Sequence, residues 1–153
     1  MAKYRVLDKE ELGAFEKEFV EFLVINSITT DDWVKIKNSD QDRTKHIISL
    51  FSDVIFEKLM RQTQYLIRRS KHNIACFHYQ ANQVVLVGLE TEDKDLDLLQ
   101  ISGDGDIPTK GVSIYNSTKS YDKQREIEMF EMLNNGAEIS DGQLYKTLCL
   151  GLA

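Results

Sequence analysis

The chain has 153 residues and a formal net charge of -6, and 42% of its residues are hydrophobic and 29% charged. This length and composition exclude a disordered, collagen-like or coiled-coil protein and are sufficient for a core without disulfides or metal. No stretch approaches the about 18 apolar residues of a membrane span, no secretory signal pattern is present, and two cysteines give no disulfide framework. We therefore expect a single cytoplasmic domain over residues 1–153.

The first part of the chain has the apolar periodicity of helices. Asp8 and Glu11 have the spacing of a capping box and precede apolar residues three and four positions apart, which predicts a helix over residues 9–26. A short helix that starts at Thr30, whose side chain is expected to cap it, is predicted over residues 30–38. A broad apolar stripe then predicts a third helix over residues 41–62.

The period of the apolar residues then changes to two. Residues 65–69, 74–79 and 84–89 are rich in β-branched and aromatic side chains and are separated by short polar turns, which predicts three antiparallel strands in a meander. Residues 111–116 have the composition of a fourth strand. Because the third strand is apolar on both faces, we expect it to be central or covered on both sides.

Two helices are expected to end the chain. Ser120 has the position of an N-cap for the first, and Asn135-Gly136 has the composition of its C-terminal stop. Ser140 is expected to cap the second helix. Helices, then a three- or four-stranded antiparallel meander, then two helices predict the α+β class and exclude a doubly wound parallel sheet.

The excess negative charge lies in one segment. Residues 90–106 contain seven acids and one base. We expect an acidic mobile loop at about residues 90–110, which is either a solvated loop or a strip that docks a basic partner through salt-sensitive steering. Its spacing of carboxylates departs from a calcium loop, because Leu98 occupies the position that requires glycine. The expected partner-binding carboxylates are Asp93, Asp95, Asp97, Asp104 and Asp106.

A second expected partner contact lies among the N-terminal helices. Trp33 follows two aspartates in a short helix and has the chemistry of an anchor in a partner's groove, although a lone tryptophan also fills a core. The first helix carries Phe15, Phe19 and Phe22 on one stripe. A homodimer or another protein would bury whatever part of this stripe the fold leaves open.

Two other groups of residues give alternative interpretations. His72, Cys76 and His78 have metal-ligand chemistry, but Cys-x-His on one strand is tight for a tetrahedral ion, so no metal or cofactor is expected. The basic residues Arg68, Arg69 and Lys71 near Tyr65 have the chemistry of a single-stranded RNA contact. The sequence pI of about 5.1 opposes that contact.

Four segments of the chain have a recognisable sequence: Tyr4–Leu12, Glu18–Ile28, Asp31–Lys37 and Leu50–Phe56. With them the chain resembles a family of small uncharacterised cytosolic proteins of Bacteroidetes-type bacteria. The resemblance runs from Tyr4 through Leu89 and again at the C-terminal helices, and it implies a bacterial, cytosolic, single-domain protein without implying an activity.

No nucleophile elbow, phosphate-binding loop or zinc-protease motif is present in the sequence. The expected function is therefore that of a non-enzymatic protein-interaction (adaptor or regulatory) protein whose partner is another protein, with a homodimer also expected. The alternatives are an RNA- or ribosome-associated module that uses the basic hairpin, and a small metal-dependent or small-molecule enzyme.

Overall fold

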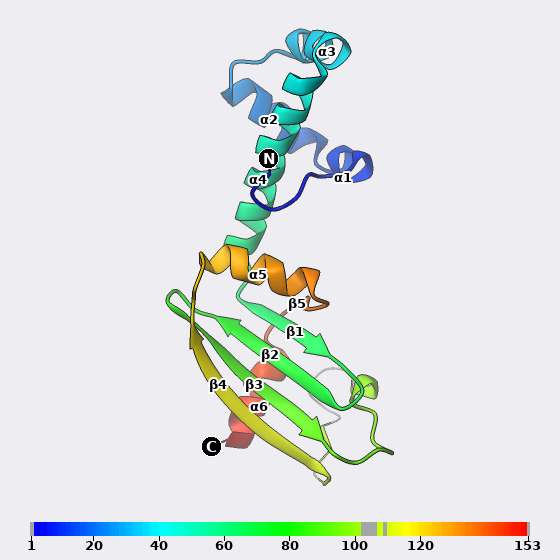
Figure 1. The fold of residues 1–153 in the computed structure, drawn as a ribbon, viewed down its shortest axis with the longest axis vertical. Helices are drawn as coiled ribbons and strands as arrows, with labels where there is room; N and C mark the ends of the chain where they lie inside the picture. The colour runs from blue at the N-terminus through cyan, green and yellow to red at the C-terminus, as the bar shows by residue number, and fades with distance from the viewer. Residues whose placement is uncertain (1, 102–106, 109, 153) are drawn as a thin grey trace. The chain divides into compact units, whose positions relative to one another are not determined.

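The computed structural model describes residues 2–101, 107–108 and 110–152. The chain divides into two compact units, Met1–Leu59 and Met60–Ala153, which we call the helical unit and the sheet unit. Figure 1 shows the helices of the first and the strands of the second, and the predicted α+β class is confirmed. None of the helices in the described part of the chain has the length and apolar character needed to cross a membrane.

The helical unit contains α1 (Lys9–Ala14), α2 (Glu16–Ile25), α3 (Thr30–Ser39) and most of α4 (Gln41–Gln62). The predicted helix over 9–26 is two helices, because the backbone of Phe15 (φ -106°, ψ 26°) interrupts it. The predicted capping box of Asp8 and Glu11 is present. The cap of α3 is Thr29 rather than the predicted first helical residue.

Aromatic packing holds the helical unit together. The ring of Phe19 lies 5.0 Å from that of Trp33 and 4.9 Å from that of Phe51, and Phe22 lies 5.4 Å from Phe51. Phe19, Phe22 and Trp33 pack against the buried side chains of Leu23, Ile36 and Ile47. The aromatic stripe of the second helix is therefore used inside this unit.

The sheet unit contains one antiparallel sheet with the strand order β4-β3-β2-β1-β5. The predicted meander is confirmed, and β5 is an additional strand that pairs with β1. The strands are β1 (Tyr65–Arg69), β2 (Asn73–Tyr79), β3 (Gln83–Thr91), β4 (Val112–Ser120) and β5 (Glu138–Ser140).

The two last helices begin later than the sequence predicts. Ser120 is the last residue of β4, and α5 (Arg125–Asn134) begins after Gln124, which makes no side-chain cap. Ser140 ends β5, and α6 (Gln143–Leu152) begins three residues later. The hydroxyl of Ser140 accepts a hydrogen bond from the amide of Gly142 at 3.0 Å, so it shapes the turn before the helix. The predicted stop at Asn135-Gly136 is present.

The sheet buries most of one face against α6. Alternate side chains of the strands pack on that face against α6, which Figure 1 shows crossing the strands. Leu98, in the short 3₁₀ helix η1 (Leu98–Gln100), and the following Ile101 are 0% and 5% exposed in the same core. These two side chains anchor the described part of the expected mobile loop to the sheet. The buried members of this core are Ile67, Ile74, Cys76, Val87, Leu89, Leu98, Ile101, Leu144 and Leu148.

The opposite face of the sheet is covered only in part, by α5. Arg125, in the first turn of α5, donates hydrogen bonds to three backbone carbonyls, those of Met60, Thr63 and Tyr79. These carbonyls lie at the end of α4, before β1 and at the end of β2. The guanidinium thereby fixes where α5 begins above the sheet.

Candidate functional site

A groove of about 330 Å³ lies between α5 and the partly covered face of the sheet. Its floor is formed by Phe77 of β2 with Val84 and Leu86 of β3, all of them half-buried. Met132 and Asn135 of α5 line the other side. The groove arises because successive strand residues alternate between faces, so the β3 segment that is apolar on both faces presents Val84 and Leu86 away from α6.

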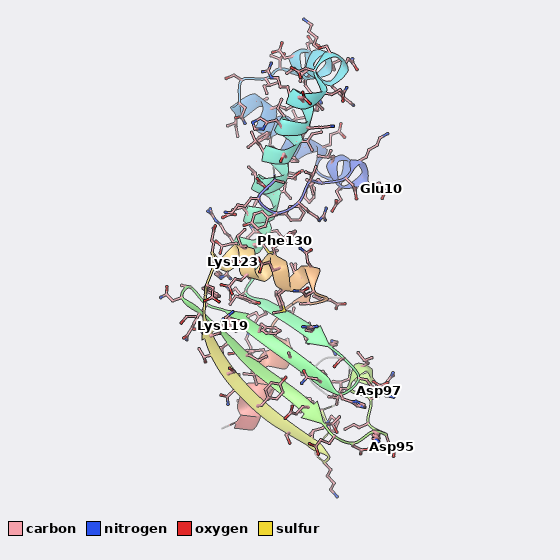
Figure 2. The ribbon with its side chains drawn as sticks, viewed as in Figure 1. Glu10, Asp95, Asp97, Lys119, Lys123 and Phe130 are labelled. Carbon is pink, nitrogen blue, oxygen red and sulfur yellow. The ribbon has the colours of Figure 1, made fainter. Side chains whose placement is uncertain are left out.

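Paired charges line the rim of this groove. The Nζ of Lys119 on β4 lies 3.6 Å from Oε1 of Glu128, and the Nζ of Lys123 lies 2.5 Å from Oε1 of Glu131. The backbone amide of Lys123 also donates to Glu128 at 3.0 Å. Figure 2 shows both lysines at the α5 end of β4. Because each of these rim charges has an opposite partner, the groove favours an apolar group over an ionised one.

Tyr79 lines the groove and packs against Tyr121. The rings of Tyr79 and Tyr121 are stacked with centroids 6.3 Å apart, and the hydroxyl of Tyr121 donates to the carbonyls of Gln80 and Gln83 at 2.6 and 2.9 Å. Burial raises the pKa of both phenols above its usual value. Both therefore remain protonated at neutral pH and contribute packing and hydrogen bonds rather than a catalytic base.

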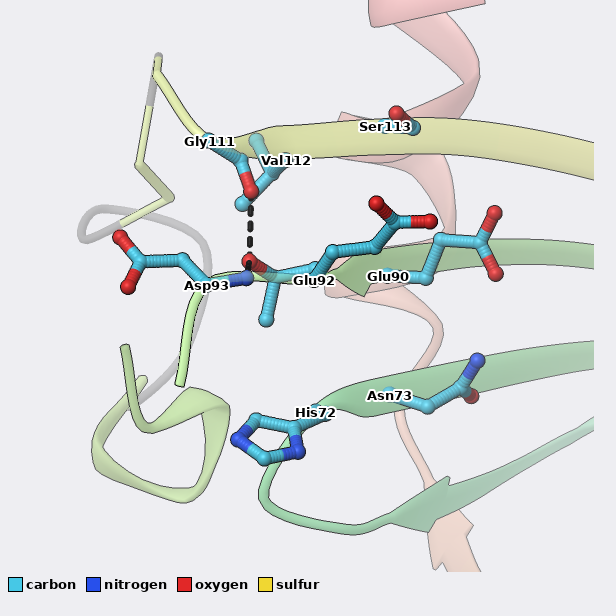
Figure 3. A pocket seen from close by; sticks show the side chains of 9 residues that line it. His72, Asn73, Glu90, Glu92, Asp93, Gly111, Val112 and Ser113 are labelled. Carbon is cyan, nitrogen blue, oxygen red and sulfur yellow. Dashed lines mark hydrogen bonds between the residues drawn. The ribbon is translucent and has the colours of Figure 1, made fainter. Parts of the chain in front are cut away.

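A second hollow, of about 490 Å³, lies at the opposite end of β3 and β4. Figure 3 shows Glu90, Glu92 and Asp93 around it, together with the hydrogen bond of 2.5 Å from the hydroxyl of Thr91 to the carbonyl of Gly111. The three acidic residues are exposed to solvent. The hollow is an open, negatively charged surface at the end of the sheet.

The expected partner-binding aspartates are only partly free to act as a docking strip. Asp93 lines the acidic hollow, and its Oδ1 accepts a hydrogen bond from the amide of Asp95 at 2.9 Å. The Oδ1 of Asp97 accepts one from the amide of Leu99 at 2.9 Å and caps η1. Asp104 and Asp106 lie outside the described residues.

The three candidate metal-ligand residues lie in β2 and in the turn before it. Cys76 and His78 share one face, as predicted, but His72 is exposed in the turn before β2, at the acidic hollow. Burial raises the pKa of Cys76 to about 12, and His78 stacks on Tyr65 with centroids 4.6 Å apart. Within the described ranges, no group of three histidine, cysteine, aspartate or glutamate residues is arranged to hold a metal ion.

The basic residues of the RNA alternative do not form one surface. Arg68 and Tyr65 project from opposite faces of β1, because three positions separate them on a strand. Arg69 donates to the carbonyl of Ile101 at 2.8 Å, which ties it to the core-anchored loop. Lys71 is exposed in the turn after β1. The aromatic ring and the exposed arginine are therefore not positioned to contact one nucleotide strand together.

Trp33, the expected anchor, is half-buried against Phe19 within the helical unit. The groove residues were not predicted from the sequence as a site. Their only signal was the apolar segment of β3, since an apolar strand face needs a cover and α5 covers it incompletely.

Comparison with known proteins gives a family and no activity. A family model described as a family of unknown function (DUF6495) matches residues 1–152. No curated protein and no solved structure matches the chain. The expected resemblance to an uncharacterised family is thereby confirmed, and its bacterial group and its compartment stay predictions.

Proposed function

We propose that this chain, which belongs to the family of unknown function DUF6495, is a non-enzymatic protein-interaction protein. Its groove under α5 holds an apolar segment of a partner protein. The observation that carries the proposal is the apolar floor of Phe77, Val84 and Leu86, left half-exposed beneath a helix. Apolar surface of this kind, rimmed by charged groups, is typical of a surface that another protein covers.

The chemistry of the groove supports binding rather than catalysis. The two tyrosine phenols stay protonated, and the carboxylates of Glu128 and Glu131 lie beside the ammonium groups of Lys119 and Lys123. A partner side chain gains mainly by leaving water, which contributes about 1.5–3 kcal/mol for one fully buried leucine or phenylalanine.

The acidic hollow offers a second contact for a basic part of the same partner. Glu90, Glu92 and Asp93 are exposed there, so their attraction for a basic segment would act at a distance and fall with salt. The RNA-binding and enzymatic alternatives stay predictions.

The test uses a groove variant and a matched control in the same unit. Leu86→Lys places a charge on the floor, whereas Leu99→Lys makes the same change at a leucine that is 51% exposed and outside the groove. Tagged wild type and both variants are used to purify partners from cells of the source organism, and circular dichroism confirms that each is folded. Met132→Glu, on the other side of the groove, replaces Leu86→Lys if that variant does not fold.

A protein retained by wild type and Leu99→Lys and lost with Leu86→Lys supports the proposal. Titration of that protein is then expected to give at least about tenfold weaker binding to Leu86→Lys and near-unchanged binding to Leu99→Lys. Equal retention by all three proteins, or nucleic acid in place of a protein, overturns it.

A further inference from the structure

The strand β4 forms a long, regular edge of the sheet. It pairs with β3 over nine residues without a bulge, from Val112 opposite Thr91 to Ser120 opposite Gln83. Figure 1 shows it as the outermost strand. Natural edge strands are usually short, bulged, or protected by proline and charge, but β4 carries one charged residue, Lys119, and no proline. The other edge, β5, has only three residues.

The hydrogen-bonding alternation of the sheet shows which groups of β4 face outward. Gln80 donates to Gln83 at 2.9 Å and Thr91 to His72 at 3.1 Å, which places the odd-numbered residues of β3 toward β2. The even-numbered residues of β3 therefore bond to the odd-numbered residues of β4. The amides and carbonyls of residues 112, 114, 116, 118 and 120 point away from the sheet, and within the described ranges no backbone group beyond β3 pairs with them.

We propose that a second copy of this chain pairs with β4 through its own β4, antiparallel and centred on Asn116. In this register all nine residues of each strand face the other strand, Asn116 faces its own copy, and every outward amide and carbonyl meets a partner. The two sheets become one continuous sheet across the dimer. This inference concerns the outward backbone groups of β4, whose Ser117 and Lys119 side chains also line the groove, and it goes beyond the proposed function.

The side chains of β4 are compatible with this register. The only charged residue, Lys119, comes opposite Ser113 of the copy, on the same face as Glu90, which lies opposite Ser113 on β3. A parallel arrangement would instead place Lys119 against Lys119. Ile114 meets Thr118, which is a favourable β-branched pair. Lys119 is already paired within its own chain with Asp122 and Glu128, so the register brings no unpaired charge to the copy and places no like charges of β4 opposite each other.

The first test compares the same substitution on the two edges of the sheet. Thr118→Pro removes an outward amide of β4, and Ile139→Pro removes an outward amide of β5, while neither removes a hydrogen bond within the sheet. Sedimentation equilibrium over a range of concentrations is expected to show a dimer for wild type and Ile139→Pro, and at least tenfold weaker association for Thr118→Pro.

A second variant tests the centre of the register without changing the backbone. Asn116→Asp places two carboxylates face to face, so it is expected to weaken the dimer at pH 7, and less so at high salt. Asn116→Cys is expected to form a disulfide-linked dimer on oxidation with diamide, and Thr118→Cys is not, because its partner across the strands is Ile114.

A monomeric wild type at all accessible concentrations overturns the inference, and so does a dimer that Thr118→Pro and Asn116→Asp leave intact. Neither result affects the groove, whose own test uses Leu86→Lys. Loss of partner binding in Leu86→Lys with an unchanged dimer would in turn leave the β4 inference standing.

Discussion

Removal of the Arg125 guanidinium is expected to destabilise the sheet unit more than any other single charged-residue change described above. Its Nη1 donates to the carbonyl of Met60 at 3.1 Å, and its Nη2 to those of Thr63 at 2.6 Å and Tyr79 at 3.0 Å. Its side chain is only 16% exposed, so water replaces these donors poorly. Arg125→Met would leave three carbonyls without this donor.

The magnitude follows from those carbonyls. A hydrogen bond to a charged group contributes about 1.5–3 kcal/mol, and the cost of burying the guanidinium offsets part of the total, so we expect a loss of about 3 kcal/mol. With a urea m-value of about 2 kcal/mol/M, the unfolding midpoint would fall by about 1.5 M. Arg125→Lys keeps the charge but lacks the planar fork, and an intermediate loss is expected.

The assay must report on the sheet unit. The single tryptophan of the chain, Trp33, lies in the helical unit, so its fluorescence follows residues 1–59. Hydrogen exchange of the β2 amides under increasing urea follows the sheet instead. Arg68→Met is the matched control, because Arg68 is exposed and a change within about 0.5 kcal/mol is expected there. If Arg125→Met lowers the midpoint no more than Arg68→Met, the three hydrogen bonds do not stabilise the unit.

The ring of Tyr115 occupies the space beside Gly88, and its hydroxyl donates a hydrogen bond to Asn73 at 3.0 Å. A methyl group at position 88 would displace this ring, so Gly88→Ala is expected to lower the free energy of unfolding by about 1 kcal/mol. In a Tyr115→Ala background the same substitution is expected to cost much less. An equal cost in both backgrounds, measured by urea unfolding, would contradict this. Burial, together with the charges of Arg125 and Lys146, lowers the pKa of His78 below 6.5 in the folded protein. The imidazole therefore binds a proton more readily in the unfolded chain than in the folded one. The contribution of His78 to the free energy of unfolding should therefore be constant above about pH 7 and fall as the pH decreases through 6.5. The free energy of unfolding of His78→Gln should fall less steeply over the same pH range. The Arg5 guanidinium lowers the pKa of Glu11 to about 2, and NMR titration of Arg5→Met should show that pKa rising toward 4.5.

The parts of the fold that depend on local periodicity could be predicted from the sequence. The bounds of α4 agree with the prediction because an apolar stripe runs from Ile47 to Met60 and no glycine or proline interrupts the 22 residues of the helix. The break at Phe15 follows Gly13, but a single glycine is also tolerated within a helix, and the three residues of β5 are too few to show a period of two. Ser120 has the composition of a cap, but pairing with Gln83 extends β4 through it. For β5 and Ser120, pairing with a neighbouring strand decides the local structure.

The candidate site could be predicted only in part. The apolar character of Val84 and Leu86 indicates a face that needs covering, but no local pattern shows that Glu128 and Met132 of α5 stand beside it. Conversely, Asp93, Asp95 and Asp97 have the appearance of a free acidic strip, although the carboxylates of Asp93 and Asp97 accept hydrogen bonds from nearby backbone amides. Whether a polar side chain is free for a partner depends on such contacts, which composition does not contain.

The position of β5 in the sheet bears on the order in which the chain folds. Neighbours in the meander β1–β4 follow each other in sequence, whereas β5 pairs with β1 between Tyr65 and Ser140, 75 positions apart. Early in folding, the entropy lost in closing so long a loop outweighs the energy gained from three residue pairs. We therefore expect β5 to dock after the folding transition state, so that Ile139→Ala speeds unfolding and leaves the folding rate nearly unchanged in stopped-flow measurements. The meander would then be the template on which the C-terminal part of the chain assembles.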